Sequence, residues 1–172
     1  YKTASKIFIF ITSIVLILVS GLRHEGVGRD TYAYIFFYED IQYTSWDDIW
    51  RNFFQRAFMP KDYEDRDPGL SIIMKCLYTI GLSAREWLFF VASFLILSLG
   101  IVVYRYSENL KVVLYSYVFY VALFYGYLPN SAVRQSVAFA FVLWAFLLLR
   151  NRRFVLAIIS ITLGAVIHRS AF

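Results

Sequence analysis

Apolar segments long enough to cross a membrane follow one another through this chain of 172 residues. A helix that crosses about 30 Å of hydrocarbon needs about 20 residues, with about 17 as the lower bound. Hydrophobic residues make up 60% of the chain and charged residues only 17%, which is too apolar for a soluble domain. We therefore predict an all-α, polytopic transmembrane helical bundle that forms a single domain, residues 1–172. Five spanning helices are predicted, at residues 7–22, 87–104, 112–128, 133–149 and 154–172.

Cysteine and histidine are too scarce in this chain to indicate a metal centre. The one cysteine, Cys76, excludes an internal disulfide, and His24 and His168 are the only histidines. The formal net charge is +5, but the basic residues lie beside apolar segments rather than together on a polar surface. We therefore predict no metal, no cofactor and no nucleic-acid partner.

The basic residues are distributed unevenly around the apolar segments, and this distribution predicts the topology. Arg150, Arg152 and Arg153 form the densest basic cluster, within a very short connection. The positive-inside rule places this cluster in the cytoplasm and residues 23–68 outside it. We therefore expect a multi-pass protein of the cell membrane, in contact with membrane lipids.

The apolar segment at residues 69–84 is short and carries Lys75 in its middle. A lysine at mid-membrane costs ~3 kcal/mol on insertion scales. The basic clusters obey one topology only if this segment enters and leaves the membrane on the same face. We therefore favour a re-entrant or membrane-surface helix here. Lys75 should then lie near water or a headgroup, and Lys75→Leu should be tolerated or stabilising. A full span is the alternative, and it requires another membrane dip within residues 32–58.

Residues 23–68 form an extracytoplasmic loop in this topology, and the loop is both acidic and aromatic. It holds ten of the twelve acidic residues of the chain, together with six basic ones. Its many large apolar side chains argue against disorder and favour short interfacial helices. Ser45 is a candidate N-cap for one of these helices. Asp47 and Asp48 would then lie in its first turn, where the helix dipole favours negative charge.

Two glycines, Gly26 and Gly28, follow the first apolar segment. They permit a tight turn whose backbone amides point toward a ligand. Arg23 and Arg29 are candidates for binding phosphate, and Asp30 is a candidate for accepting a proton or a sugar hydroxyl. The alternative interpretation is a helix end followed by an ordinary surface turn.

Arg134 and Gln135 lie at the start of the apolar segment at residues 133–149. An arginine at the membrane boundary must find an anion or a water-filled cavity, and its planar guanidinium suits a pair of phosphate oxygens. The alternative is an arginine that contacts lipid headgroups. Gln135 weakens this alternative, because a glutamine gains nothing by pointing at lipid.

Two further motifs carry candidate residues. Asp67 precedes a proline and a glycine at the start of the segment at residues 69–84, where it would otherwise be a helix-start carboxylate. His168 and Arg169 follow the last apolar segment. A histidine can act as a base or as a cationic phosphate partner near neutral pH, although it can also lie at a membrane boundary without a task.

The predicted topology gathers several of these candidates on one face, beside the aromatic acidic loop. Cations at the membrane edge suit a lipid-linked phosphate. Aromatic rings and carboxylates suit a carbohydrate, through stacking and through hydrogen bonds to hydroxyl groups. The candidates on this face are Arg23, Asp30, Arg134 and His168.

These motifs together resemble the EpsG family of multi-pass membrane proteins from exopolysaccharide and capsule clusters. Nearly the whole chain takes part in the resemblance, with the motifs in the order of the family. It implies a Wzy-like polymerase and a longer chain than this one, because family members have further spans. The motifs are Arg23, Gly26 to Tyr32, Asp67 to Gly69, Val133 to Gln135 and His168 to Ala171.

The resemblance implies an enzyme that joins oligosaccharide repeat units carried on polyprenyl pyrophosphate at the outer face of the membrane. Asp30 or His168 would act as the base, and Arg134 and Arg23 would bind the pyrophosphate. Arg29, Asp67, Gln135 and Arg169 would contribute to substrate binding. A flippase or transporter of lipid-linked sugars is one alternative, and a non-catalytic partner of other polysaccharide-assembly proteins is another.

Overall fold

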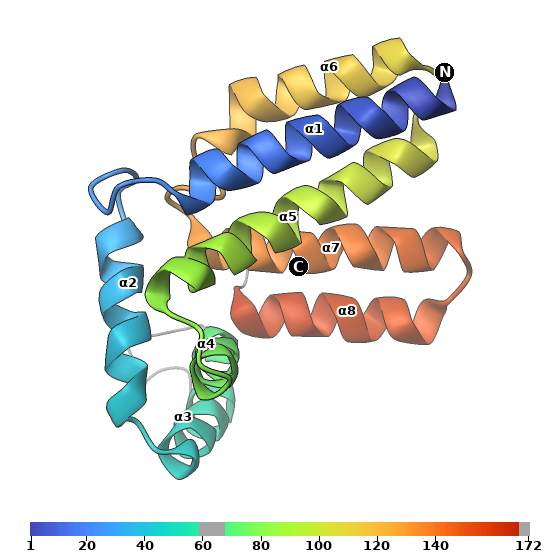
Figure 1. Ribbon diagram of the computed structural model, residues 1–172. Helices are drawn as coiled ribbons and strands as arrows, with labels where there is room; N and C mark the ends of the chain where they lie inside the picture. The colour runs from blue at the N-terminus through green and yellow to red at the C-terminus, as the bar shows by residue number, and fades with distance from the viewer. Residues whose placement is uncertain (59–67, 169–172) are drawn as a thin grey trace.

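The computed structural model describes residues 1–58 and 68–168, and these residues form helices joined by turns (Figure 1). The predicted all-α membrane class is confirmed. The elements are α1 (Lys2–Gly21), α2 (Thr31–Asp40), the 3-10 helix η1 (Ile41–Tyr43), α3 (Trp46–Phe58), α4 (Gly69–Thr79), α5 (Ala84–Tyr106), α6 (Leu110–Tyr120), the π-helical turn η2 (Val121–Tyr125), α7 (Val133–Arg150) and α8 (Phe154–Ile167).

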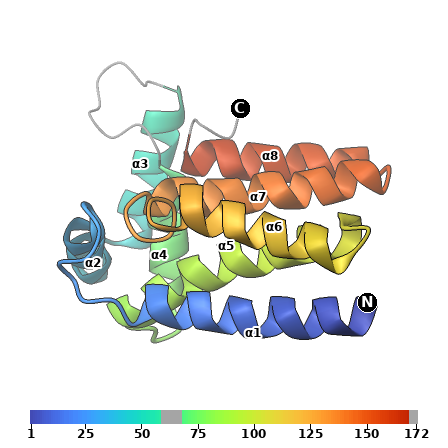
Figure 2. The same ribbon diagram turned by 90° about the horizontal axis from the view of Figure 1, so that it is seen from above.

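The helices fall into two groups with different directions (Figures 1 and 2). In both views α1, α5, α6, α7 and α8 run side by side along the bundle, whereas α2, α3 and α4 cross it at one end. Helix α4 begins and ends at this end, so it does not run the length of the bundle. We call the end that carries α2, α3 and α4 the capped end. The opposite end carries the turns between α5 and α6 and between α7 and α8.

Within the described residues, three helices have the length and apolar composition to cross a membrane: α1, α5 and α7. The two other helices aligned with them are shorter apolar helices, at Leu110–Tyr125 and Phe154–Ile167. Both are shorter than the spans predicted at residues 112–128 and 154–172. After Tyr125 the backbone turns through Gly126 and Pro129, and proline has no N–H with which to continue a helical ladder.

Side-chain caps fix several helix starts. Ser83 and Glu86 form a capping box at the start of α5. The side-chain oxygen of Asn109 accepts a hydrogen bond from the Val112 amide at the start of α6. The hydroxyl of Ser45 accepts from the Asp48 amide at 3.1 Å, which confirms the N-cap predicted for this helix.

Helices α2 and α7 are held against α5 by stacked aromatic rings. The fully buried Trp87 of α5 stacks between Tyr38 of α2 and Phe90, with ring centroids 5.9 Å apart in each pair. Phe90 stacks on Phe94, whose ring meets Phe141 of α7 edge to face. Aromatic pairs of this kind contribute about 0.5–1.5 kcal/mol each beyond the area they bury.

Small and hydroxyl side chains allow the remaining helices to pack closely. Ala138 and Ala157 are buried in α7 and α8, and the Ser160 hydroxyl donates to the Phe141 carbonyl of α7. Small residues let membrane helices approach one another closely. The outward faces of α1, α6 and α8 carry exposed large apolar side chains, among them Phe10, Phe119 and Ile158. Such faces suit contact with lipid.

Candidate functional site

The glycine turn after α1 is fastened to the turn before α7. Gly28 has a φ of +90°, and a Cβ at this position would overlap the Asn130 carbonyl. The Thr31 hydroxyl contacts the same carbonyl at 2.8 Å, and the Arg29 amide donates to the Ser131 hydroxyl at 3.2 Å. Two motifs about a hundred positions apart in the sequence therefore form one structural unit.

Arg23 lies inside this unit. Its side chain is only 7% exposed, and it donates to the Ser20 carbonyl at 2.6 Å and to the Thr31 hydroxyl at 3.2 Å. Its second terminal nitrogen, Nη2, is buried without a hydrogen-bond partner among the described residues. Burial lowers the pKa of the guanidinium to about 10. Arg23 therefore ties the end of α1 to the start of α2.

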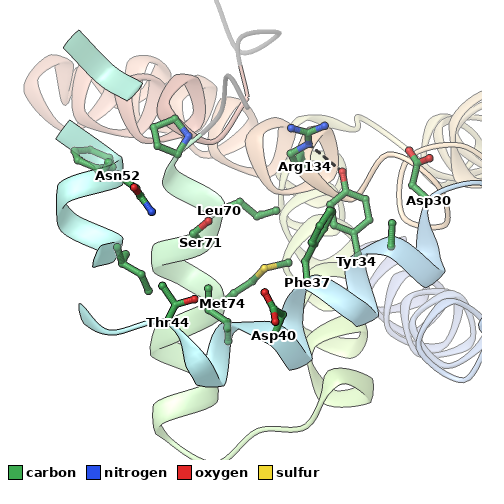
Figure 3. Close-up of a pocket in the computed structure, with 15 residues that line it drawn as sticks. Asp30, Tyr34, Phe37, Asp40, Thr44, Asn52, Leu70, Ser71, Met74 and Arg134 are labelled. Atoms are coloured by element: carbon green, nitrogen blue, oxygen red, sulfur yellow. Dashed lines mark hydrogen bonds between the residues drawn. The ribbon is translucent and has the colours of Figure 1, made fainter. Parts of the chain in front are cut away.

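Arg134 lies in the first turn of α7 and faces α2. Its Nε donates to the phenol oxygen of Tyr34 at 3.0 Å (Figure 3). Burial raises the pKa of Tyr34, although the neighbouring Arg134 opposes this shift, so the phenol is protonated near neutral pH. The charge of Asp30 also raises this pKa, which places a carboxylate, a phenol and a guanidinium within electrostatic reach of one another.

A cavity of about 400 Å³ opens beside this group at the capped end (Figure 3). Its walls come from α2, η1, α3, α4 and the first turn of α7. Its lining combines polar, aromatic and aliphatic side chains, and the polar groups suit a ligand with both hydroxyl and anionic groups. The lining residues are Asp30, Ala33, Tyr34, Phe37, Asp40, Ile41, Thr44, Ile49, Asn52, Phe53, Pro68, Leu70, Ser71, Met74 and Arg134.

Lys75 supports the wall of this cavity from α4. It is 8% exposed, its Nζ donates to the Ile41 carbonyl at 3.0 Å, and it lies 5.6 Å from the centre of the Tyr78 ring. The ammonium therefore satisfies a carbonyl at the end of α2 instead of facing lipid. The expectation that Lys75 lies near water or a headgroup is wrong, because the packing of η1 on α4 buries it.

The comparison with protein families decides the family of this chain. The EpsG family model matches residues 6–172. The chain belongs to the EpsG family. No curated protein and no solved structure is significantly similar to it.

The EpsG-family motifs predicted as one site are only partly brought together. Asp30 and Arg134 line the cavity, whereas Arg23 lies beneath the glycine turn. Arg29 is exposed and contacts Ser131 through its backbone amide. Gln135 and His168 are half-buried at the capped end, outside the residues that line the cavity. Asp67 and Arg169 lie outside the described residues.

Several lining residues of this EpsG-family cavity were missed by sequence reasoning. Tyr34, Phe37 and Asp40 follow Asp30 at spacings of four, seven and ten residues, which place them on one face of a helix. That spacing is the signal that could have identified them. Thr44, Asn52 and Ser71 give no such signal, because they reach the cavity from η1, α3 and α4 through tertiary packing.

No cluster of three or more histidine, cysteine, aspartate or glutamate side chains suited to a metal ion occurs in the part of the chain that the structure describes. Asp30 and Asp40 are the carboxylates among the residues that line the cavity. The described lining residues of this EpsG-family cavity offer two carboxylates, one guanidinium and one phenol, together with hydroxyl and amide groups.

Proposed function

We propose that this EpsG-family chain carries part of the active site of a membrane polysaccharide polymerase. Its substrates would be oligosaccharide repeat units linked to polyprenyl pyrophosphate. The cavity at the capped end is the observation that carries the proposal. It combines Arg134 for a phosphate, Asp30 for a proton or a hydroxyl, and aromatic rings for sugar faces.

The reaction would be a glycosyl transfer at the end of the cavity that holds Asp30 and Arg134. An acceptor hydroxyl oxygen forms a bond to the anomeric carbon of the donor sugar, and the bond from that carbon to the pyrophosphate oxygen breaks. The bonding electron pair leaves with the lipid pyrophosphate, whose growing charge Arg134 stabilises. Asp30 accepts the proton of the acceptor hydroxyl as the general base.

The proposal includes an orientation in the cell membrane. The capped end would face outward and Arg150 to Arg153, at the opposite end, would face the cytoplasm. Helices α2, α3 and α4 would then lie along the outer membrane interface, because they cross the bundle direction. Exposed rings on α3 and on η1, including Trp50, Phe54 and Tyr43, suit such an interface.

Single-cysteine labelling tests this orientation. Tyr43→Cys and Asn151→Cys are introduced separately in a Cys76→Ser background, since Cys76 is the only native cysteine and is exposed. An impermeant thiol reagent added to intact cells should label Tyr43→Cys, and Asn151→Cys only after the membrane is opened. Labelling of Asn151→Cys in intact cells would contradict the proposed orientation.

The activity is tested with cells that lack the gene and with cells complemented by the full-length protein. Loss of long polysaccharide on a gel, with accumulation of single repeat units on lipid at the outer face, indicates a polymerase. Lipid-linked units trapped in the cytoplasmic leaflet would indicate a flippase instead. Complementation by a full-length Asp30→Asn variant, at wild-type polymer length, would contradict the active site proposed here.

A further inference from the structure

The cavity extends along helix α2, so its two ends can be distinguished. Asp30 precedes the first residue of α2 and Asp40 is its last residue, and both line the cavity. Ten residues of α-helix rise by about 15 Å. The two carboxylates therefore cannot act on the same reacting atom. They lie at opposite ends of α2, on the wall of the cavity (Figure 3).

The end at Asp30 is built for an anion and a proton transfer. Arg134 donates from Nε to the phenol oxygen of Tyr34, which fixes the plane of the guanidinium. The same contact leaves the phenol proton of Tyr34 available to a ligand oxygen. Tyr34 is 6% exposed and packed in the core, so its hydroxyl is held in place beside the guanidinium.

The end at Asp40 carries neutral hydrogen-bonding groups. Thr44, Asn52 and Ser71 line the cavity here from η1, α3 and α4, and Phe53 adds an aromatic ring (Figure 3). Together with a carboxylate, these groups can accept from and donate to several sugar hydroxyls at once. Among the described residues, those that line this end include no lysine or arginine.

We propose that the cavity holds its ligand in one direction, with the phosphate at Tyr34 and Arg134 and with the sugar chain extending to a hydroxyl-binding subsite at Asp40. This inference rests on the proposed function and deepens it. Tyr34 contributes a second hydrogen-bond donor to the phosphate, and Asp40 determines which sugars fit. Asp40 is thus a specificity residue and does not touch the reacting atoms.

Two variants separate the two ends. Tyr34→Phe keeps the packed ring and removes the phenol oxygen, and Asp40→Asn keeps the shape of an exposed side chain and removes its charge. Asp47→Asn is the matched control, because Asp47 is also exposed and does not line the cavity. All variants are made in the full-length protein, which is reconstituted in lipid nanodiscs.

Binding of two ligands tests the two ends of the cavity without requiring turnover. One is polyprenyl pyrophosphate without sugar, and the other is the lipid-linked repeat unit. Tyr34→Phe should weaken binding of both probes about tenfold, the effect of one hydrogen bond to a charged group. Asp40→Asn should weaken only the sugar-bearing probe, by about tenfold, for the same reason. The control should bind both probes as the wild type does.

Elongation kinetics add a second readout. Asp40→Asn should raise KM for the lipid-linked unit about tenfold and change kcat by less than about twofold, because it weakens binding of the ground state and of the transition state equally. Equal weakening of both probes by Asp40→Asn would overturn the assigned direction, and so would unchanged binding of the sugar-bearing probe. Binding in the expected pattern without any elongation would refute the polymerase and leave the subsites standing.

Discussion

The Nε of Arg134 donates a hydrogen bond of 3.0 Å to the phenol oxygen of Tyr34, which joins two residues that are 100 positions apart. The contact links the first turn of α7, an apolar bundle helix, to α2, which crosses the end of the bundle (Figure 3). A charged side chain at the end of a bundle helix thereby faces protein and cavity. The guanidinium is oriented before any ligand arrives, which lowers the entropic cost of binding one.

Arg134→Lys should lose much of the elongation activity, because lysine keeps the charge and loses the planar fork that reaches both Tyr34 and a phosphate. Loss of a charge-assisted contact worth ~3 kcal/mol in the transition state slows turnover by roughly a hundredfold. The measurement is elongation of lipid-linked repeat units in vesicles, normalised to inserted full-length protein. Arg153→Lys, at the exposed opposite end, is the matched control. Full activity of Arg134→Lys would contradict the phosphate-binding role and favour the alternative that Arg134 contacts lipid headgroups.

Gly28→Ala should destabilise the protein strongly, while Gly26→Ala should be tolerated. Gly28 has a positive φ, and an added Cβ would overlap the Asn130 carbonyl, whereas a Cβ on Gly26 meets its first neighbour, His24 Nδ1, at 3.4 Å. A strained backbone together with a steric clash costs about 2–4 kcal/mol. Thermal unfolding of the two variants in nanodiscs checks the difference. Equal melting temperatures would show that the two turns are not packed together.

Lys75→Leu should lower stability by about 1–3 kcal/mol, because it leaves the buried Ile41 carbonyl without its donor. The sequence alone suggested the opposite result, because a re-entrant helix would place Lys75 near water or a headgroup and Lys75→Leu would be tolerated or stabilising. Lys111→Leu is the matched control, since Lys111 is exposed in α6. Unfolding in lipid measures both. A Lys75→Leu protein as stable as the wild type would mean that α4 does not hold η1 through this hydrogen bond.

The buried phenol of Tyr38 should make the folded protein less stable at alkaline pH. Its hydroxyl donates to the Leu82 carbonyl at 2.8 Å, and burial raises its pKa to about 12. In the unfolded chain Tyr38 loses its proton near pH 10. The contribution of protonated Tyr38 to the stability of the folded protein is therefore complete below pH 10 and is lost as pH rises from 10 to 12. Tyr38→Phe should cost about 1 kcal/mol at pH 8. The difference between wild type and variant should shrink to zero and then reverse as pH rises toward 12, because the cost of this pKa shift exceeds about 1 kcal/mol. A constant difference would contradict this account.

The helical elements of this protein were largely predictable, because each depends on its own stretch of sequence. The apolar segments beginning at Ile7, Trp87 and Val133 lie within α1, α5 and α7. The Ser45 cap was also predictable, since it needs only a hydroxyl and an amide three residues apart. The span predicted at residues 112–128 runs past the observed end of the helical stretch at Tyr125, which is followed by Gly126 and Pro129.

The candidate site was only partly predictable. Asp30 and Arg134 stand out because a charge beside an apolar segment needs a partner, whatever the fold. Asn52 and Ser71 do not stand out, since neutral residues of this kind occur on any polar surface. Arg23 was predicted to bind pyrophosphate, and the structure buries it against Ser20 and Thr31, where most of its donors are used.

The sequence by itself determined the all-α membrane class and the position of most apolar helices. Helical periodicity, hydrophobic length and the distribution of basic residues are local or additive properties, so they can be calculated without a fold. Only the tertiary structure decided that α2, α3 and α4 cross the bundle, that Lys75 is buried and that Tyr34 meets Arg134. These features depend on contacts between distant segments, whose free energies are set by packing that no single segment encodes.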